Sequence, residues 1–387
     1  MKIIYLASVY DPDVYRKLFR SGSKPIQAAN KYHTLMCEGF VANGCRLVAL
    51  SCLPVNRAIN SRFFIFEKPS VCNGVSFHYL PLVNLKPVKQ LLFFLSAFFR
   101  LLFASGDSVL VYDGLVVSAS WGACLGAKLR GIKTCCILTD LPANLSIGAS
   151  SLGKRINDTL ISFADSFILL TEQMNDVVNK KRRPYLVSEG HSDIAMKSRQ
   201  RAAHEGDGKT RLMYAGGLEA KYGLDALCRA FLAIRREGEE LHLYGKGGYL
   251  PVLKELAREE NGLFYHGVIS AAEVVDRELE ADLLVNPRSP DEDFTRYSFP
   301  SKTMEYMASG VPVVMCRLPG MPEEYCPYVY LFDSGKEADI AAKLRQLLDL
   351  PAEELRKKGS AAKAFVLEKK NNVVQTKRIL DRLLSKL

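Results

Sequence analysis

Short runs of apolar residues recur along the chain, and the stretches between them place apolar residues three or four positions apart. The runs are rich in β-branched and aromatic residues and are bounded by Gly, Asp or Pro, as is typical of buried strands. Helical spacing covers residues 223–236, 250–259 and 271–280. Alternating strands and helices predict an α/β fold whose parallel sheets carry helices on both faces. The predicted strands are KIIYLAS, CRLVALSC, SVLVYDG, TCCILTD, SFILLT, TRLMYAGG, ELHLYGKG, GLFYHG, ADLLVNPR, VPVVMC and YVYLF.

A charged segment that contains Pro and Gly interrupts this pattern between residues 180 and 209. We interpret it as a linker with a loop between two α/β domains. The predicted N-terminal domain covers residues 1–185, and the predicted C-terminal domain covers 186–370. Residues 371–387 predict a basic amphipathic helix that packs back on a domain, with the N-terminal one proposed as its partner. Ligands are expected at the carboxyl ends of the strands.

The composition is that of a globular protein of 387 residues, with 48% hydrophobic and 24% charged residues. The net charge of +10 favours partners that carry phosphate, such as nucleotides, nucleic acid or anionic membranes. Nucleic acid has no further support, because the sequence lacks helix-turn-helix, zinc-finger and RNP patterns. The apolar run at the N-terminus is short and ends at Asp11, so it predicts a first strand and not a signal peptide.

The ten cysteines form no CxxC pair, and several lie in apolar runs. This pattern indicates reduced, buried thiols in a cytosolic protein, with no zinc site. Residues 86–106, KPVKQLLFFLSAFFRLLFASG, are too short and too interrupted to span a membrane. Two interpretations stay open for them. They could form a core helix, or they could lie in a membrane interface with Lys86, Lys89 and Arg100 near lipid phosphates.

Glycines follow two neighbouring predicted strands in the second half. Gly216 and Gly217 precede Lys221 and the start of a helix, which together could hold a phosphate. Gly245 and Lys246 form a second such loop, and the turn YHGVIS could offer backbone groups to a flat base. Ordinary strand-to-helix turns also contain glycine, so these loops by themselves leave both interpretations open.

The stretch YSFPSKTMEYMASGVPVV, residues 297–314, predicts a short helix followed by a buried strand. Pro300 suits its first turn, Ser298 or Ser301 could cap it, and Gly310 ends it. Glu305 is the helix's single carboxylate and could accept hydrogen bonds from two sugar hydroxyls. On this stretch alone, a Glu that is favoured by the helix dipole or paired with Lys302 is the better explanation.

Taken together, these segments resemble the retaining glycosyltransferases of family 4, which have the GT-B fold. The matching pieces appear in the family's order over about residues 211–330, and FPSKTMEYMASGVPVV is the most specific of them. The resemblance implies two Rossmann-like domains that face each other across a cleft, with a nucleotide sugar held by the second. It implies these roles: ribose binding by Glu305; diphosphate binding by Gly216, Gly217, Lys221, Ser301 and Lys302; base contacts by Gly245, Lys246 and the backbone near Val268; and a place near the transferred sugar for Asp140.

The sequence departs from the family pattern at two positions. Tyr297 stands eight residues before Glu305, where the family has a second Glu that contacts the sugar. Glu292 or Asp293 could replace that Glu, Tyr297 could indicate another sugar or backbone recognition, or the protein could be catalytically impaired. Some members have Arg at the position of Gly217, which leaves more of the diphosphate charge to Lys221 and Arg288.

The function implied is retaining, metal-independent transfer of a sugar from a UDP- or GDP-sugar to a lipid-linked or polysaccharide acceptor. No cofactor and no nucleic-acid partner are expected. The alternative is a nucleotide-sugar-binding partner of another glycosyltransferase. A cytoplasmic location is predicted, and peripheral contact with the inner face of the cell membrane rests on the positive charge and on residues 86–106.

Overall fold

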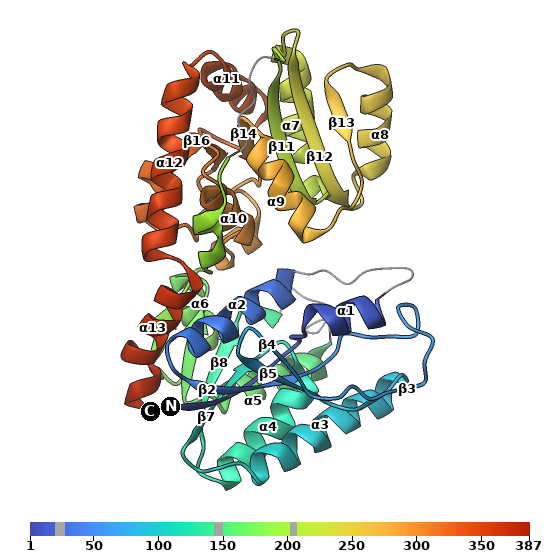
Figure 1. The fold of residues 1–387 in the computed structure, drawn as a ribbon, viewed down its shortest axis with the longest axis vertical. Coiled ribbons are helices and arrows are strands. Elements are labelled where there is room, and N and C mark those ends of the chain that lie inside the picture. Colours follow the sequence, from blue (N-terminus) through green and yellow to red (C-terminus); the bar gives the residue numbers. More distant parts are fainter. Residues whose placement is uncertain (20–27, 143–149, 202–206) are drawn as a thin grey trace. The chain divides into compact units, whose positions relative to one another are not determined.

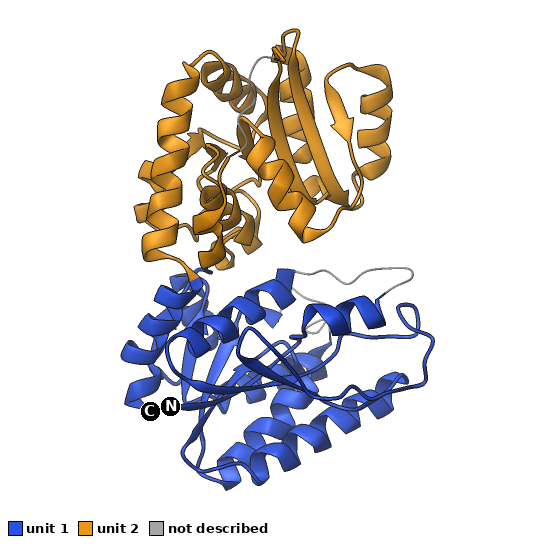
Figure 2. Cartoon of the chain, viewed as in Figure 1, with its two compact units in different colours: residues 1–191, 372–387 blue, residues 192–371 orange. Residues whose placement is uncertain are grey.

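The computed structural model describes residues 1–19, 28–142, 150–201 and 207–387. The chain forms two compact units (Figure 2). Unit 1 comprises residues 1–191 and 372–387, and unit 2 comprises residues 192–371. Each unit contains a sheet of mainly parallel strands with helices between them (Figure 1), which confirms the predicted α/β fold.

The sheet of unit 1 has the strand order β10-β9-β8-β7-β1-β2-β5-β4. Its pairs are parallel except the β4–β5 pair, which is antiparallel. Every residue of β7 is buried, as expected for a central strand covered on both faces. The strands of unit 1 are β1 (Lys2–Ala7), β2 (Arg46–Ser51), β4 (Ser70–Cys72), β5 (Val75–Tyr79), β7 (Ser108–Asp113), β8 (Lys133–Leu138), β9 (Ser166–Leu169) and β10 (Tyr185–Val187), together with the antiparallel pair β3 (Phe64–Ile65) and β6 (Leu82–Val83).

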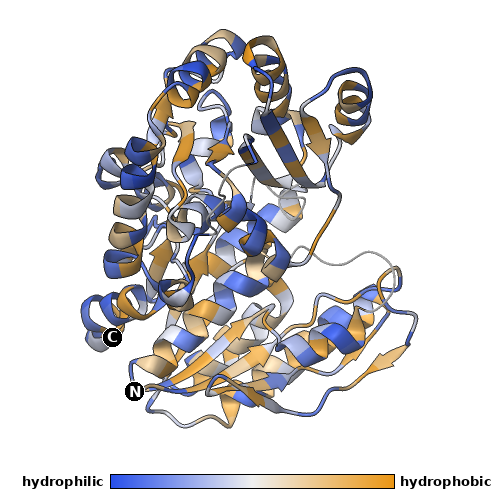
Figure 3. Ribbon diagram, turned by 45° about the horizontal axis from the view of Figure 1, so that its top comes forward, coloured by the Kyte–Doolittle hydropathy of each residue, from blue (hydrophilic) through white to orange (hydrophobic). Residues whose placement is uncertain are grey.

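The helices of unit 1 follow its strands along the chain, as the sequence pattern predicts. Figure 3 shows hydrophobic positions along the strands and both kinds of position along the helices. They are α1 (Pro12–Leu18), α2 (Ala28–Ala42), α3 (Lys86–Leu102), α4 (Val117–Leu129), α5 (Ser151–Ser162), α6 (Glu172–Val178) and α13 (Asn372–Arg382), followed by the 3₁₀ turn η7 (Leu384–Lys386).

The segment 180–209, interpreted above as linker and loop, is partly ordered secondary structure. Residues 185–187 form β10, which extends the sheet of unit 1 beside β9. The backbone N–H of Phe167 donates to the carbonyl of Pro184 at 3.0 Å, so pairing begins directly after the proline. The linker interpretation was wrong here because three residues suffice for an edge strand when a neighbouring strand supplies the hydrogen bonds. The segment also contains the 3₁₀ helix η3 (Ile194–Ser198).

Helix α3 has one face in the core and another exposed. Phe93, Ala97 and Leu101 are buried. The helix packs closely on α4, since a Cβ added at Gly122 would lie 2.0 Å from the carbonyl oxygen of Phe94. The core-helix interpretation therefore holds for this face. None of the helices within the described ranges is long and apolar enough to cross a membrane.

Helix α13 packs on α2 within unit 1. The Asn372 side chain donates to the backbone oxygen of Leu35 at 3.1 Å, and Gln375 donates to the oxygen of Gly190 at 3.0 Å. Gly39 permits the close approach, because a Cβ there would lie 2.4 Å from the backbone oxygen of Asn372. All ten cysteines lie within the described ranges and are free, and most of them are buried.

The sheet of unit 2 is parallel throughout, with the strand order β13-β12-β11-β14-β15-β16. The helical stretches predicted from spacing correspond to α7, α8 and α9. The strands are β11 (Thr210–Gly217), β12 (Glu239–Lys246), β13 (Leu263–Tyr265), β14 (Leu283–Asn286), β15 (Val313–Cys316) and β16 (Tyr330–Phe332). The helices are α7 (Leu224–Ile234), α8 (Leu250–Glu259), α9 (Ala271–Glu280), α10 (Ser301–Ser309), α11 (Glu337–Leu348) and α12 (Ala352–Lys369), with 3₁₀ turns η4 (Ala220–Tyr222), η5 (Asp293–Tyr297) and η6 (Glu323–Tyr328).

Candidate active site

The two glycine loops of unit 2 lie side by side at the carboxyl ends of β11 and β12. These strands are parallel neighbours, and their register pairs Gly216 with Gly245 and Gly217 with Lys246. Gly216 has φ 152° and Gly245 has φ 135°, a region that side chains rarely adopt. A Cβ at Gly245 would lie 1.8 Å from the backbone oxygen of Gly216. The glycines therefore allow the two loops to approach each other at the edge where parallel sheets bind ligands.

Lys302, in the first turn of α10, reaches over the end of β11. Its ammonium donates to the Tyr214 hydroxyl at 3.1 Å and lies 4.2 Å from the centre of that ring. The hydroxyl in turn donates to the backbone oxygen of Gly217 at 2.8 Å. A Cβ at Gly216 would lie 1.4 Å from the Lys302 Nζ. Glycine at position 216 thus makes room for the lysine side chain.

The environment of Lys302 favours loss of its proton. Burial, and secondarily the charge of Arg288, lower the pKa of Lys302 from its ordinary value near 10.5 to about 7. The charges of Glu305 and Glu278 act in the opposite direction. An anion bound beside Lys302 would restore the preference for the charged form.

Helix α10 is held against β11 by a buried tyrosine. The Tyr306 hydroxyl accepts from the backbone N–H of Ala215 at 2.9 Å. Gly310 ends the helix with φ 84°, as predicted. The predicted start was wrong by one residue, because Pro300 occupies the N-cap and neither serine caps the helix. Ser301 is the exposed first helical residue, and its backbone N–H belongs to the first turn, where N–H groups have no partner within the helix.

Lys221 and Arg288 share one pair of aromatic rings. The Lys221 Nζ lies 5.6 Å from the ring centres of both Tyr222 and Phe294. The Arg288 guanidinium lies 4.6 Å from the Tyr222 ring and 5.4 Å from the Phe294 ring. Cation–π contacts of this length are favourable. Both cations, which the sequence analysis predicted separately, therefore contact the same two aromatic rings.

The start of α7 lies against the end of β14. Gly223 has φ 79° and precedes the helix, and a Cβ there would lie 2.1 Å from the backbone oxygen of Pro287. Arg288 follows directly, so the helix N-terminus and this cation lie close to each other. A helix N-terminus attracts anions through its free N–H groups and its dipole.

The acidic loop before α10 carries Phe294, whose ring contacts both Lys221 and Arg288. Thr295 is fully buried and donates through its hydroxyl to the backbone oxygen of Glu292 at 2.6 Å. Asp293 is exposed, and Tyr297 ends η5 in a half-buried position.

The residues predicted to frame a base lie on two connected turns. The backbone N–H of Gly245 donates to the oxygen of Gly267 at 2.8 Å, and the Tyr265 hydroxyl donates to the oxygen of Gly245 at 3.0 Å. Val268 is 58% exposed, so its backbone is accessible beside this junction. Lys246 is also exposed. Asp140 lies elsewhere, in unit 1 just after β8, where its carboxylate accepts from the N–H of Leu141 at 2.7 Å.

The sequence interpretation missed the aromatic residues that position the cations. Tyr214 orients Lys302, Tyr306 fixes α10, and Tyr222 with Phe294 carries Lys221 and Arg288. Tyr222 adjoins Lys221 in the sequence, so their contact could have been predicted. The contacts of Phe294 could not, because Lys221 is distant from it in the sequence. Across the described residues, no cluster of three or more His, Cys, Asp or Glu could hold a metal ion.

Comparison with known proteins gives one family match and several similar structures. Residues 209–350 match the family described as Glycosyl transferases group 1. No curated protein matches the chain in sequence. Sucrose-phosphate synthase (tll1590) from Thermosynechococcus elongatus is similar in structure, with TM-score 0.70, 15% identity and 100% of each chain covered. Anabaena Alr3699/HepE in complex with UDP matches at 0.66, and the lipopolysaccharide outer core galactosyltransferase WaaB at 0.64, with 15% and 14% identity and both chains fully covered in each case.

These likenesses extend over the full length of the chain, whereas the family match covers most of unit 2. At such low identity, the structural matches show the fold alone. The chain therefore has the GT-B fold, and residues 209–350 form a group 1 glycosyltransferase domain.

Proposed function

We propose that the protein transfers a sugar from a UDP- or GDP-sugar to a hydroxyl of a lipid-linked or polysaccharide acceptor, with retention of configuration and without a metal ion. The convergence of three cations on the carboxyl edge of the unit 2 sheet carries this proposal. Lys302 lies over the end of β11, and Lys221 and Arg288 share the Tyr222–Phe294 pair. They supply positive charge where a diphosphate would otherwise need a metal.

The chemistry requires stabilisation of the leaving group. When the bond between the sugar carbon and the phosphate oxygen breaks, its electron pair stays on the diphosphate, and the sugar gains positive character. Lys221, Arg288 and the N–H groups at the start of α7 would stabilise that developing charge. In a retaining reaction, the acceptor hydroxyl attacks on the face that the diphosphate leaves, and a diphosphate oxygen takes its proton.

The remaining parts of the donor would be bound by residues next to these cations. Glu305 lies one turn after Lys302 on α10 and would accept hydrogen bonds from the ribose hydroxyls. Ser301 would add its N–H to the diphosphate site, and the turns at Gly245 and Val268 would contact the base. The Alr3699/HepE structure holds UDP, which favours UDP as the nucleotide. We assign Asp140 a place near the transferred sugar, and Glu292 or Asp293 the sugar contact that Tyr297 does not supply as a carboxylate.

Tyr297 favours a second candidate, a nucleotide-sugar-binding partner without transfer activity. A panel of UDP-, GDP-, ADP- and CMP-sugars tests donor binding, because a ligand of the folded state raises the melting temperature by mass action. A transfer and donor-hydrolysis assay with the stabilising sugar then separates the candidates. Activity that is lost in Glu305→Ala excludes the binding-only candidate. Stabilisation without turnover of any acceptor would support it, and no stabilisation by any donor would contradict both.

The pKa of Lys302 predicts a pH dependence with opposite signs for donor binding and for stability. The unfolded chain keeps its Lys proton up to about pH 10.5, whereas folded Lys302 loses it near pH 7, so its contribution to the unfolding free energy rises with pH between these values. Donor affinity should fall over the same range as the positive charge disappears. Titration calorimetry at pH 6 and pH 9 measures the difference, and Lys302→Met should abolish it. An equal pH dependence in that variant would contradict the assignment.

We further propose that unit 1 binds the inner face of the membrane through the outer face of α3. Four apolar residues of this face and the C-cap residue Phe103 are exposed at helical spacing. The exposed fractions of Val88, Leu91, Leu95, Phe99 and Phe103 are 36%, 58%, 38%, 49% and 81%. Lys86 and Arg100 flank them in exposed positions. An apolar stripe with flanking cations matches the interface of an anionic bilayer.

The double variant Leu91→Ser and Phe103→Ser is expected to lose most of its binding to phosphatidylglycerol vesicles at low salt, because the apolar contact disappears. Both residues are exposed, so folding should be unaffected. Sedimentation with vesicles measures the bound fraction, and added salt should lower it for the wild type. Leu152→Ser, at a residue of α5 that is 67% exposed, is the matched control. Failure of the wild type to bind at low salt would refute the proposal.

A further inference from the structure

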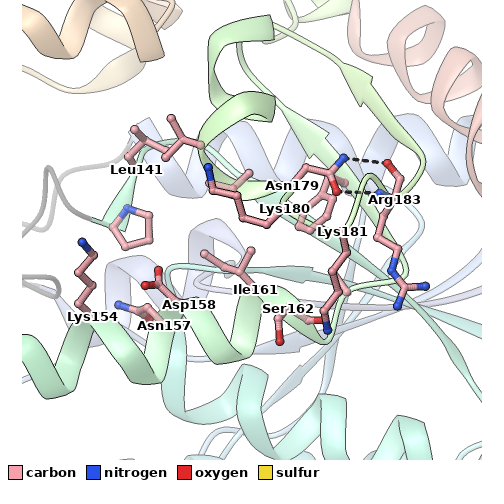
Figure 4. A pocket seen from close by; sticks show the side chains of 15 residues that line it. Leu141, Lys154, Asn157, Asp158, Ile161, Ser162, Asn179, Lys180, Lys181 and Arg183 are labelled. Carbon is pink, nitrogen blue, oxygen red and sulfur yellow. Dashed lines mark hydrogen bonds between the residues drawn. The ribbon is translucent and has the colours of Figure 1, made fainter.

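A pocket of about 430 Å³ lies in unit 1 and is lined by residues of that unit only (Figure 4). Helix α5 forms one wall, and the end of α6 with the loop 179–183 forms the other. Leu141, Ile161, Phe167 and Val177 contribute apolar surface. The volume is within the usual range for sites that bind small organic molecules.

The rim of this pocket is strongly cationic. Lys154, Lys180, Lys181 and Arg183 line it, against a single carboxylate, Asp158. The Lys180 ammonium donates to the backbone oxygen of Asp176 at 2.7 Å, and that of Lys181 to the backbone oxygen of Ser162 at 3.1 Å. Within the described ranges, none of the four cations forms an ion pair with a carboxylate. Their charge is therefore available to an anion.

Asn157 provides an independent indication of a ligand. It lines the pocket from α5, one turn after Lys154 and one turn before Ile161, and is 2% exposed. Neither its Oδ1 nor its Nδ2 has a hydrogen-bond partner among the described residues. A buried amide without hydrogen-bond partners is energetically unfavourable. A polar group of a bound molecule at this end of the pocket would supply the missing partner.

The wall opposite α5 is fixed before any ligand binds. The Asn179 side chain donates to Asn175 Oδ1 and to the backbone oxygen of Arg183, both at 2.8 Å, and accepts from the N–H of Arg183 at 2.8 Å. These bonds close the loop that carries Lys180 and Lys181. In Figure 4, Lys154 and Lys180 come from opposite sides of one end of the pocket, and Arg183 lies at the other end.

We propose that this pocket binds an organic phosphate monoester with an apolar tail. The phosphate would lie between Lys154 and Lys180, where the Asn157 amide can donate to it. The tail would lie along Ile161, Phe167 and Val177. The site is a property of unit 1 alone and does not depend on the transfer reaction proposed above.

Titration calorimetry of the full chain with butyl, hexyl and octyl phosphate, below their micelle concentrations, tests the proposal. Each buried CH₂ should tighten binding about fourfold until the tail outgrows the pocket. Inorganic phosphate and octanol should bind much more weakly than octyl phosphate, because each lacks one half of the ligand. Octyltrimethylammonium, with a similar tail and the opposite charge, should not bind.

Two variants locate the site. Lys154→Gln with Lys180→Gln should weaken octyl phosphate at least tenfold, and Val177→Trp should block the tail. Arg182→Gln changes an exposed cation of the same loop that does not line the pocket, so it should leave the affinity unchanged. The proposal is overturned if octyl phosphate does not bind, if Val177→Trp binds it as well as the wild type does, or if the ammonium compound binds equally.

Discussion

Replacement of Lys221 by alanine is expected to lower the rate of sugar transfer about 100- to 1000-fold, the usual effect of removing one group that stabilises a developing anion. Lys221 and Arg288 both form cation–π contacts with the rings of Tyr222 and Phe294. These contacts hold the Lys221 charge near the start of α7. Because that charge counts most when the diphosphate leaves, kcat should fall more than donor affinity. Steady-state kinetics with the donor that stabilises the protein measures both.

Arg288→Ala should show a smaller loss of the same kind, since this arginine is proposed to replace the one that the family has at the position of Gly217. Lys254→Ala on α8 is the control for removal of a lysine charge outside the site. If Lys221→Ala raised KM and left kcat unchanged, Lys221 would bind the ground state only, and the proposed stabilisation of the leaving group would be wrong.

Gly245→Ala is expected to lower the free energy of unfolding by roughly 2–5 kcal/mol. The new Cβ would lie 1.8 Å from the backbone oxygen of Gly216, and φ at this position is 135°. Overpacking against backbone contributes about 1–3 kcal/mol, and backbone strain a further 1–2 kcal/mol. Urea unfolding measures the change.

Gly267→Ala separates the two contributions. Gly267 has φ 78°, but a Cβ there would have nothing within 4 Å, so only the strain of about 1–2 kcal/mol should appear. Gly267 also lies next to Gly245, through the hydrogen bond of its oxygen to the Gly245 N–H. Equal losses in the two variants would show that the contact between the glycine loops does not determine the effect.

Much of the fold was predictable because it follows from local patterns. The spacing of apolar residues placed α8 and α9 at their observed bounds, and Gly310 ended α10 where a left-handed residue was needed. Prediction failed where the structure of a segment depends on a neighbouring strand or helix. The three residues of β10 are a strand only because β9 supplies their hydrogen bonds. The sequence did not show which face of α3 is buried, because that depends on the packing of α3 against α4.

The candidate site shows the same division. By itself, the sequence determined the parallel strands, the glycines at their ends and the cations that follow them, because these depend on residue type and short spacing. Only the tertiary structure decided which of these groups meet. Lys302 reaches Tyr214 across 88 positions of sequence, and Phe294 joins Lys221 to Arg288. Strand order governs such contacts. Strand β14 pairs with β11, and the hydrogen bond that the Tyr306 hydroxyl accepts from the Ala215 N–H holds α10 against the end of β11, so distant segments converge at one edge of the sheet.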